Sequence, residues 1–242
     1  MTFSPRLALF AAFPLTLCLF SGCAGLSNMG HVAEKPAQPV HLNHGGDAKL
    51  PSGLQRVILL PLAGGSVASP ESVSALDPVL IAALQLQNRF EVVPLTREEC
   101  RRYFQNDEIS SVSAIPSNLM SVLKREYAAD AVLFVDLTVY RAYHPLAIGL
   151  RAKLAMLDGA HLAWTFDTVF SADDPAVAEN AVRFLKSRDQ GGLPADLIAV
   201  DLESPLRFGT YASNAMFATL PPISTSTPQV MAKSRRDATN VR

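Results

Sequence analysis

The sequence is poor in cysteine and in net charge. Its 242 residues contain three cysteines and one tryptophan, and the formal net charge is −1 at pH 7. The near-neutral charge argues against a nucleic-acid-binding protein, which presents a basic face. Cys18 and Cys23 lie near the N-terminus, which leaves Cys100 alone in the main body of the chain. An internal disulfide is therefore excluded there, and no Cys/His spacing is typical of a zinc site. We interpret Cys100 as a helix residue rather than a catalytic thiol.

The chain also lacks the short motifs that carry common enzyme chemistry. No Gly-x-Ser-x-Gly elbow occurs. The Gly64-Gly65 turn is followed neither by the lysine and hydroxyl residue of a phosphate-binding loop nor by the third glycine of a dinucleotide fingerprint. His144 and His161 stand beside turns, and we interpret them as surface residues. We therefore expect no catalytic residue, no cofactor and no metal site, in a protein that is not an enzyme.

Residues 1–22 have the pattern of a secretory signal peptide. Arg6 is their only charged residue, and an uncharged, mostly apolar run follows it as far as Phe20. This run is short for a bilayer crossing, which takes about 20 apolar residues. Two small residues come next, and then a cysteine. We expect cleavage between Gly22 and Cys23.

The segment Leu19-Phe20-Ser21-Gly22-Cys23 resembles the lipobox of bacterial lipoproteins, although Phe20 stands where leucine is usual. The resemblance implies that the Cys23 thiol carries lipid and attaches the chain to a membrane. Each buried acyl CH₂ contributes about 0.8 kcal/mol, and several chains together give stable anchoring. Ala24 after the cysteine favours the outer membrane of the cell envelope, with the protein facing the periplasm. A cleaved signal with an incidental cysteine is the alternative.

Two segments without apolar periodicity flank the central region. Residues 23–54 are rich in proline and glycine, which predicts a flexible, lipidated tether. Residues 221–242 begin with two prolines and continue through Ser, Thr, Lys and Arg, which predicts a disordered tail. Residues 55–220 remain as one domain. Three histidines are scattered in the first segment, and we interpret them as solvated residues rather than metal ligands: His31, His41 and His44.

The central region has the alternating pattern of an α/β fold. Five apolar runs of strand character occur; they are residues 56–61, 90–94, 131–140, 149–157 and 161–170. Helix start signals precede the other apolar stripes; they are Ser69-Pro70 or Asp77-Pro78, Thr96, Asn118, Asp174-Pro175 and Ser204-Pro205. The last three strands are joined by short turns, which predicts an antiparallel meander. We expect an α/β (α+β) fold with a single mixed sheet and packed helices.

The order of these elements resembles the amino-terminal domain of the Tol-Pal system protein TolB. It is also similar to lipoproteins of the curli-secretion and penicillin-binding-protein-activator types. The shared landmarks are a strand ending at Pro61, a Phe-x-Val-Val strand from Phe90, and an Ala-Asp pair before the strand that begins at Ala131. The resemblance covers about residues 55–170. It implies an envelope domain that works by contacting other proteins.

Two classes of function follow from these observations. The leading hypothesis is a non-enzymatic module that binds an envelope protein or takes part in assembly. The alternative is an envelope enzyme or small-ligand-binding protein that uses the Gly64-Gly65 turn or the sheet face with Asp136 and Arg151; self-assembly into a homo-oligomer is a third reading. Lys153 and Asp167 share that face, and we expect cross-strand pairing there. A deep pocket around these groups would favour the alternative.

The lipid attachment has a direct test. Cys23→Ala removes the thiol that would carry the lipid, so we expect loss of acyl labelling and release of the protein from membranes. The measurement is metabolic labelling with a fatty acid, followed by membrane fractionation. Labelling that persists in the variant would contradict the assignment.

Overall fold

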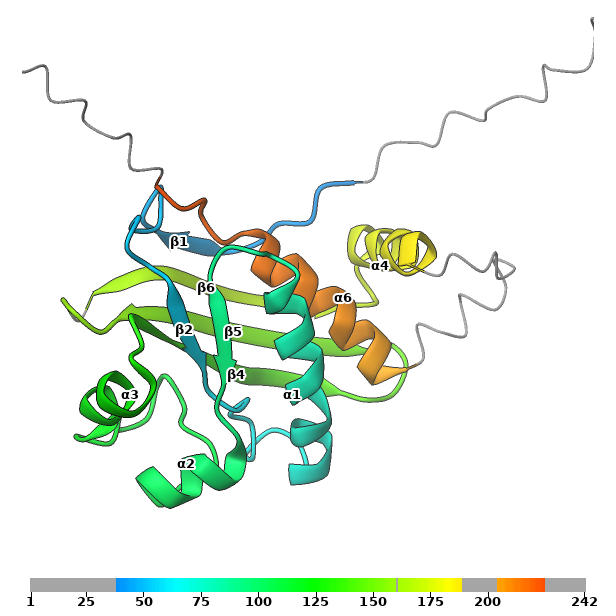
Figure 1. Ribbon diagram of the computed structural model, residues 1–242. Helices are drawn as coiled ribbons and strands as arrows, with labels where there is room; N and C mark the ends of the chain where they lie inside the picture. Colours follow the sequence, from blue (N-terminus) through cyan, green and yellow to red (C-terminus); the bar gives the residue numbers. More distant parts are fainter. Residues whose placement is uncertain (1–37, 160, 189–203, 225–242) are drawn as a thin grey trace, which may run out of the picture. The chain divides into compact units, whose positions relative to one another are not determined.

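The computed structural model describes residues 38–159, 161–188 and 204–224 (Figure 1). Its six strands are β1 His44–Gly46, β2 Arg56–Leu59, β3 Glu91–Pro94, β4 Ala131–Arg141, β5 Ala147–Met156 and β6 Leu162–Ser171. The helices within the described ranges are α1 Pro70–Gln85, α2 Arg97–Phe104, α3 Leu119–Tyr127, α4 Pro175–Arg188 and α6 Pro205–Ala218. The predicted signal peptide and Cys23 lie outside the described residues.

All six strands belong to one mixed sheet, in the order β1-β6-β5-β4-β2-β3. The strand β2 is parallel to both β3 and β4, whereas β4, β5 and β6 form an antiparallel meander. This arrangement confirms the predicted fold class. The register places Arg151 opposite both Asp136 and Asp167, so the predicted polar face lies on three adjacent strands.

The helices begin where the capping signals predict. The hydroxyl of Ser69 accepts a hydrogen bond from the Ser72 amide, and Pro70 occupies the first helical turn of α1. Asp77-Pro78 is therefore not a helix start but lies inside α1. Thr96 and Glu99 form a reciprocal capping box at the start of α2, which satisfies two backbone N–H groups that have no partner within the helix.

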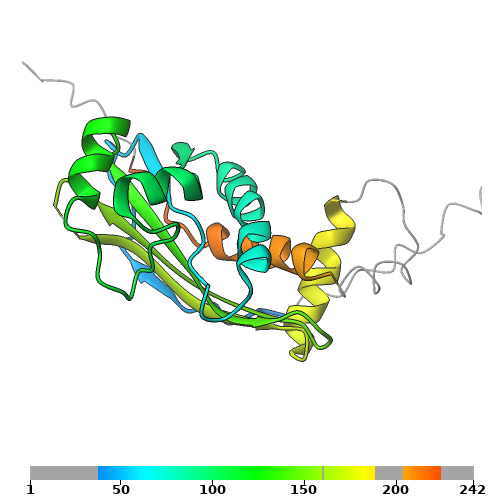
Figure 2. The ribbon, with the colours of Figure 1, turned by 90° about the horizontal axis from the view of Figure 1, so that it is seen from below.

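The core has two parts, one on each face of the sheet. The helices α1, α4 and α6 cover one face, and its largest fully buried side chains are aromatic: Trp164, Phe166, Phe170, Phe208 and Phe217. The helices α2 and α3 cover the opposite face over β2 and β4 through a second cluster that includes Ile58, Phe104, Leu123 and Phe134. Figure 2 shows α2 and α3 gathered at one end of the sheet, with α4 at the other.

The folded region is longer at both ends than the sequence predicts. Gly46 has a φ of 126° and lies so close to β6 that a Cβ atom would stand 2.7 Å from the Cα of Trp164. Glycine therefore allows β1 to pair with β6. Leu50 is fully buried and forms a parallel bridge with Ile223. The predicted tether 23–54 and tail 221–242 are wrong for residues 38–54 and 221–224, because β1 pairs with β6 and Leu50 forms a bridge with Ile223.

Candidate functional site

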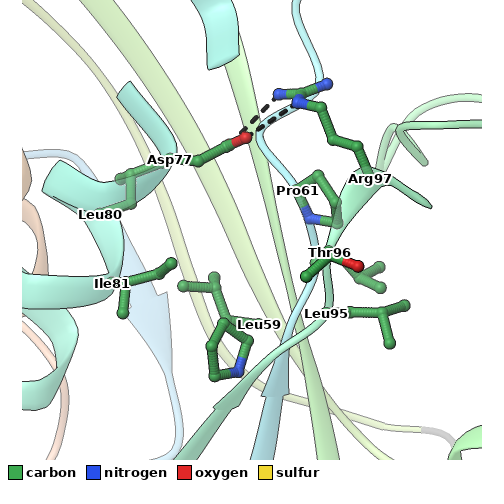
Figure 3. Close-up of a pocket in the computed structure, with 10 residues that line it drawn as sticks. Leu59, Pro61, Asp77, Leu80, Ile81, Leu95, Thr96 and Arg97 are labelled. Atoms are coloured by element: carbon green, nitrogen blue, oxygen red, sulfur yellow. Dashed lines mark hydrogen bonds and ion pairs between the residues drawn. The ribbon is translucent and has the colours of Figure 1, made fainter. Parts of the chain in front are cut away.

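A hollow of about 240 Å³ opens at the carboxyl ends of β2 and β3, between α1 and the start of α2 (Figure 3). We call it the apolar hollow. Most of its lining is apolar: Leu59, Leu60, Pro61, Leu80, Ile81, Pro94 and Leu95. The remaining lining residues are Asp77, Thr96 and Arg97. The carboxyl ends of parallel strands are where α/β folds commonly bind their ligands.

The hollow follows from the way the strands and α1 meet. The Leu95 amide donates to the carbonyl of Leu59, which keeps the end of β3 beside the end of β2. The helix α1 runs back across both strands, with Leu80 buried against the sheet and Ile81 half-buried at the opening. Figure 3 shows Leu80 and Ile81 on one side of the space, with Leu59 and Leu95 on the other.

An ion-pair network closes one end of the hollow. The Arg97 guanidinium contacts Asp77 through Nε at 2.8 Å and Glu108 through Nη1 at 3.2 Å. Its Nη2 donates to the Leu62 carbonyl at 2.8 Å, while the Leu62 amide donates to Asp77 Oδ1 at 2.9 Å. One side chain thus joins α1, the segment after β2 and the loop after α2.

Burial sets the protonation behaviour of Asp77. Loss of solvent raises the pKa of its carboxyl, while hydrogen bonds from the Leu62 amide and Arg97 oppose that rise. Because the folded-state pKa lies above the unfolded one, this group makes folding less favourable as the pH rises through the raised value. The Arg97 contact offsets part of that cost.

The Gly64-Gly65 turn binds an anionic group that belongs to the chain itself. Both amides donate to Glu108 Oε1, at 3.1 Å from Gly64 and 3.0 Å from Gly65. Successive backbone N–H groups in such turns bind anionic oxygens. Since Glu108 already fills this position, the turn does not present free amides to an external phosphate.

The predicted polar sheet face carries only part of the expected pairing. Arg151 and Asp167 form the expected cross-strand ion pair at 2.8 Å. Asp136 is buried, but it accepts from the Ser111 amide at 3.0 Å instead of pairing with Arg151. Lys153 donates to the Ser111 carbonyl at 3.0 Å rather than to a strand carboxylate. The loop after α2 folds over this part of the sheet and supplies partners that strand spacing does not reveal.

The remaining polar candidates lie apart from one another. His144 is exposed in the turn after β4, and His161 is exposed and lies 3.2 Å from Asp47, as the surface interpretation predicts. Cys100 is buried in α2, and burial raises the pKa of its thiol to about 11. Within the described ranges, no group of three or more His, Cys, Asp or Glu side chains could hold a metal ion.

The network of Asp77, Arg97 and Glu108 is not predicted from the sequence. Asp77 and Arg97 stand in or beside helix start signals, and helix capping alone accounts for polar residues at such positions. One signal could have found Arg97: it follows a strand at the edge where the carboxyl ends of the parallel strands meet. Glu108 has no such signal, because it lies in a polar loop whose path depends on the folded structure.

Comparison with known proteins gives only distant structural similarity. No protein-family model matches the chain, and no curated protein matches it. Lipoprotein GNA1162 from Neisseria meningitidis is 12% identical, with 57% of this chain and 99% of that one covered at a TM-score of 0.38. The PelC dodecamer from Paraburkholderia phytofirmans is 11% identical, with coverage of 69% and 96% and a TM-score of 0.39.

A third similar structure is the LpoB C-terminal domain from Salmonella enterica, which is 12% identical. It covers 48% of this chain and 82% of its own, at a TM-score of 0.32. At these identities and TM-scores, none of the three proteins lends a function to this chain. Separately, none of the helices in the described ranges is long and apolar enough to span a membrane.

The role of Glu108 can be measured with one substitution. Glu108→Ala leaves the Gly64 and Gly65 amides without their acceptor, so we expect both to exchange hydrogen faster. Stability should fall by about 1.5–3 kcal/mol, the range for hydrogen bonds to charged groups. Glu98→Ala, which removes an exposed carboxylate from α2, is the matched control. Equal exchange rates at the two glycines in both variants would contradict the assigned contact.

Proposed function

We propose that this chain is a non-enzymatic lipoprotein of the bacterial cell envelope that binds another protein through the apolar hollow. Lipid on Cys23 attaches it to a membrane, and Ala24 favours the outer membrane, with the domain in the periplasm. The lipobox resemblance supports the attachment. The apolar hollow supports the binding, and it is the observation that carries the proposal.

The size and chemistry of the hollow favour a side chain of a partner protein as its occupant. Its volume of about 240 Å³ is below the roughly 300–1,000 Å³ of small-molecule sites. The Asp77 carboxylate already accepts from Arg97 and from the Leu62 amide, so it is not left unpaired to orient a polar ligand. A large apolar side chain inserted into such a pocket is the usual anchor of a protein interface.

The polar sites weigh against the ligand-binding alternative. Glu108 fills the Gly64-Gly65 turn, and Arg151 is paired with Asp167. The space beside Arg151 measures about 170 Å³, which is below the roughly 300–1,000 Å³ of small-molecule sites. Glu108 thus holds the backbone of the turn, and the Arg151–Asp167 pair joins β5 to β6; both are structural roles.

Insertion of a side chain fits this edge of the sheet better than addition of a strand. The edge strand β3 ends in Pro94, which has no backbone N–H to donate to a neighbouring strand. Proline on an edge strand is a common way to block strand pairing. The partner is therefore expected to reach the hollow with an apolar side chain.

Photo-crosslinking in cells tests the proposal. A photoreactive phenylalanine analogue at Ile81 stands at the opening of the hollow, so we expect it to trap one defined partner protein. The same analogue at Ala82, the adjacent and exposed position of α1, is the matched control and should not trap it. The purified partner should then bind the unlabelled protein and lose affinity for Ile81→Asp, because a charge there opposes burial of an apolar side chain.

Three outcomes would count against this function. Identical adducts from Ile81 and Ala82 would show unspecific proximity. An adduct with a second copy of this chain would support self-assembly instead. Unchanged affinity of the purified partner for Ile81→Asp would show that binding does not use the hollow.

A further inference from the structure

One end of the sheet combines exposed apolar side chains with the point where the chain enters the domain. We call it the hairpin end; it comprises the turn between β4 and β5, the end of β6, and the first turns of α4 and α6. Tyr143 in this turn is 84% exposed, and Leu206 at the start of α6 is 44% exposed. Both side chains are therefore open to contact with another surface at this end of the domain.

A backbone hydrogen bond and an ion pair hold the elements of the hairpin end together. The Ala172 amide after β6 donates to the Leu146 carbonyl in the β4–β5 turn, at 2.8 Å. Arg141 and Asp173 form an ion pair across the same junction at 3.1 Å. A Cβ atom on Gly209 would lie 3.5 Å from Ile148 at the start of β5, which places the N-terminal half of α6 beside them.

The N-terminal segment enters the domain at this same end. The carbonyl of Gln38, the first described residue, accepts from the Asn180 side chain in α4 at 2.8 Å. The Asn43 amide then donates to Thr168 in β6 at 2.8 Å, and β1 pairs with the first half of β6. Figure 2 shows the first described segment, the start of α4 and the β4–β5 turn at one end of the sheet.

We infer that the hairpin end lies against the membrane surface, with Tyr143 and Leu206 in the headgroup region. This inference rests on the lipid attachment at Cys23 within the proposed function. Residues 24–37 reach about 50 Å at most when fully extended, so lipid on Cys23 keeps Gln38 within that distance of the bilayer. The hairpin end is then the part of the described domain that the anchor holds nearest the lipid.

The chemistry of the exposed side chains fits a lipid surface. Tyrosine combines an apolar ring with a polar hydroxyl and is enriched where a membrane meets water. Leu206, at the same end of the domain, adds apolar area that can enter the headgroup boundary. The apolar hollow lies at the end of the much shorter strand β2 and is lined by none of these residues, so a partner can occupy it while the hairpin end contacts lipid.

Tryptophan fluorescence on vesicles tests the inference. The acylated protein carries Tyr143→Trp and is reconstituted in phosphatidylethanolamine and phosphatidylglycerol vesicles that contain brominated phosphatidylcholine. Leu162→Trp, at the opposite end of β6 and 46% exposed, is the matched control. Trp164 is buried and gives the same background in both variants. We expect quenching of Tyr143→Trp to exceed that of Leu162→Trp by at least about twofold, as for a side chain in the headgroup region.

A second arm separates this inference from the lipid attachment itself. Here a histidine tag replaces residues 1–23, and nickel-chelating lipid in the same vesicles holds the chain at Ala24. Stronger quenching at position 143 in this arm supports the inference even if Cys23 proves not to be acylated in cells. Equal quenching at the two positions, stronger quenching at 162, or no quenching at either would overturn it.

Discussion

The guanidinium of Arg97 is the interaction on which the carboxyl edge of the parallel strands depends. It joins Asp77 of α1, the Leu62 carbonyl after β2 and Glu108 of the loop after α2. Glu108 in turn holds the Gly64-Gly65 turn through two amides. The positions of α1, the segment after β2 and the loop after α2 are therefore coupled to the start of α2 through one positive charge, and the apolar hollow lies directly beside it.

The energetics explain why this network is structural. Two carboxylates share one guanidinium in a partly buried place, and burial already raises the pKa of Asp77. Removing Arg97 would leave two carboxylates without their counter-charge, and a buried ion that loses its partner costs far more than the intact pair contributes. Because the carboxylates beside the hollow already have hydrogen-bond partners, an occupant of the hollow would bind through apolar contacts. An apolar side chain of a partner protein suits such a space better than a polar substrate does.

The sequence predicts the elements of this fold well because their signals are local. The capping box at Thr96, the Ser69-Pro70 start and the alternating strands of the meander each depend on residues close together in the chain. The strand β1 could not be predicted in this way. Its three residues, His44–Gly46, have no apolar pattern, and they form a strand only because they pair with β6. Likewise, Leu50 is an isolated apolar residue in the sequence, and only the folded structure brings Ile223 beside it.

The candidate site shows the same contrast between features with local sequence signals and contacts between residues far apart in the chain. Sequence pattern identified the Gly64-Gly65 turn and the face with Asp136 and Arg151, but not the groups that fill or cover them. Glu108 reaches the turn across 43 positions of the chain, and Ser111 reaches Asp136 across 25. Such contacts depend on how a polar loop packs on a finished sheet, which neither periodicity nor spacing encodes.

The central claim about the polar groups is that Glu108 fills the Gly64-Gly65 turn and so closes its two amides to an external anion. Titration of the intact protein with inorganic phosphate, followed through the amide chemical shifts of Gly64 and Gly65, tests this claim most directly. Our account predicts that both amides keep their shifts, because Glu108 occupies the turn. A saturable shift of these two amides would contradict it and would assign the turn to an external phosphate.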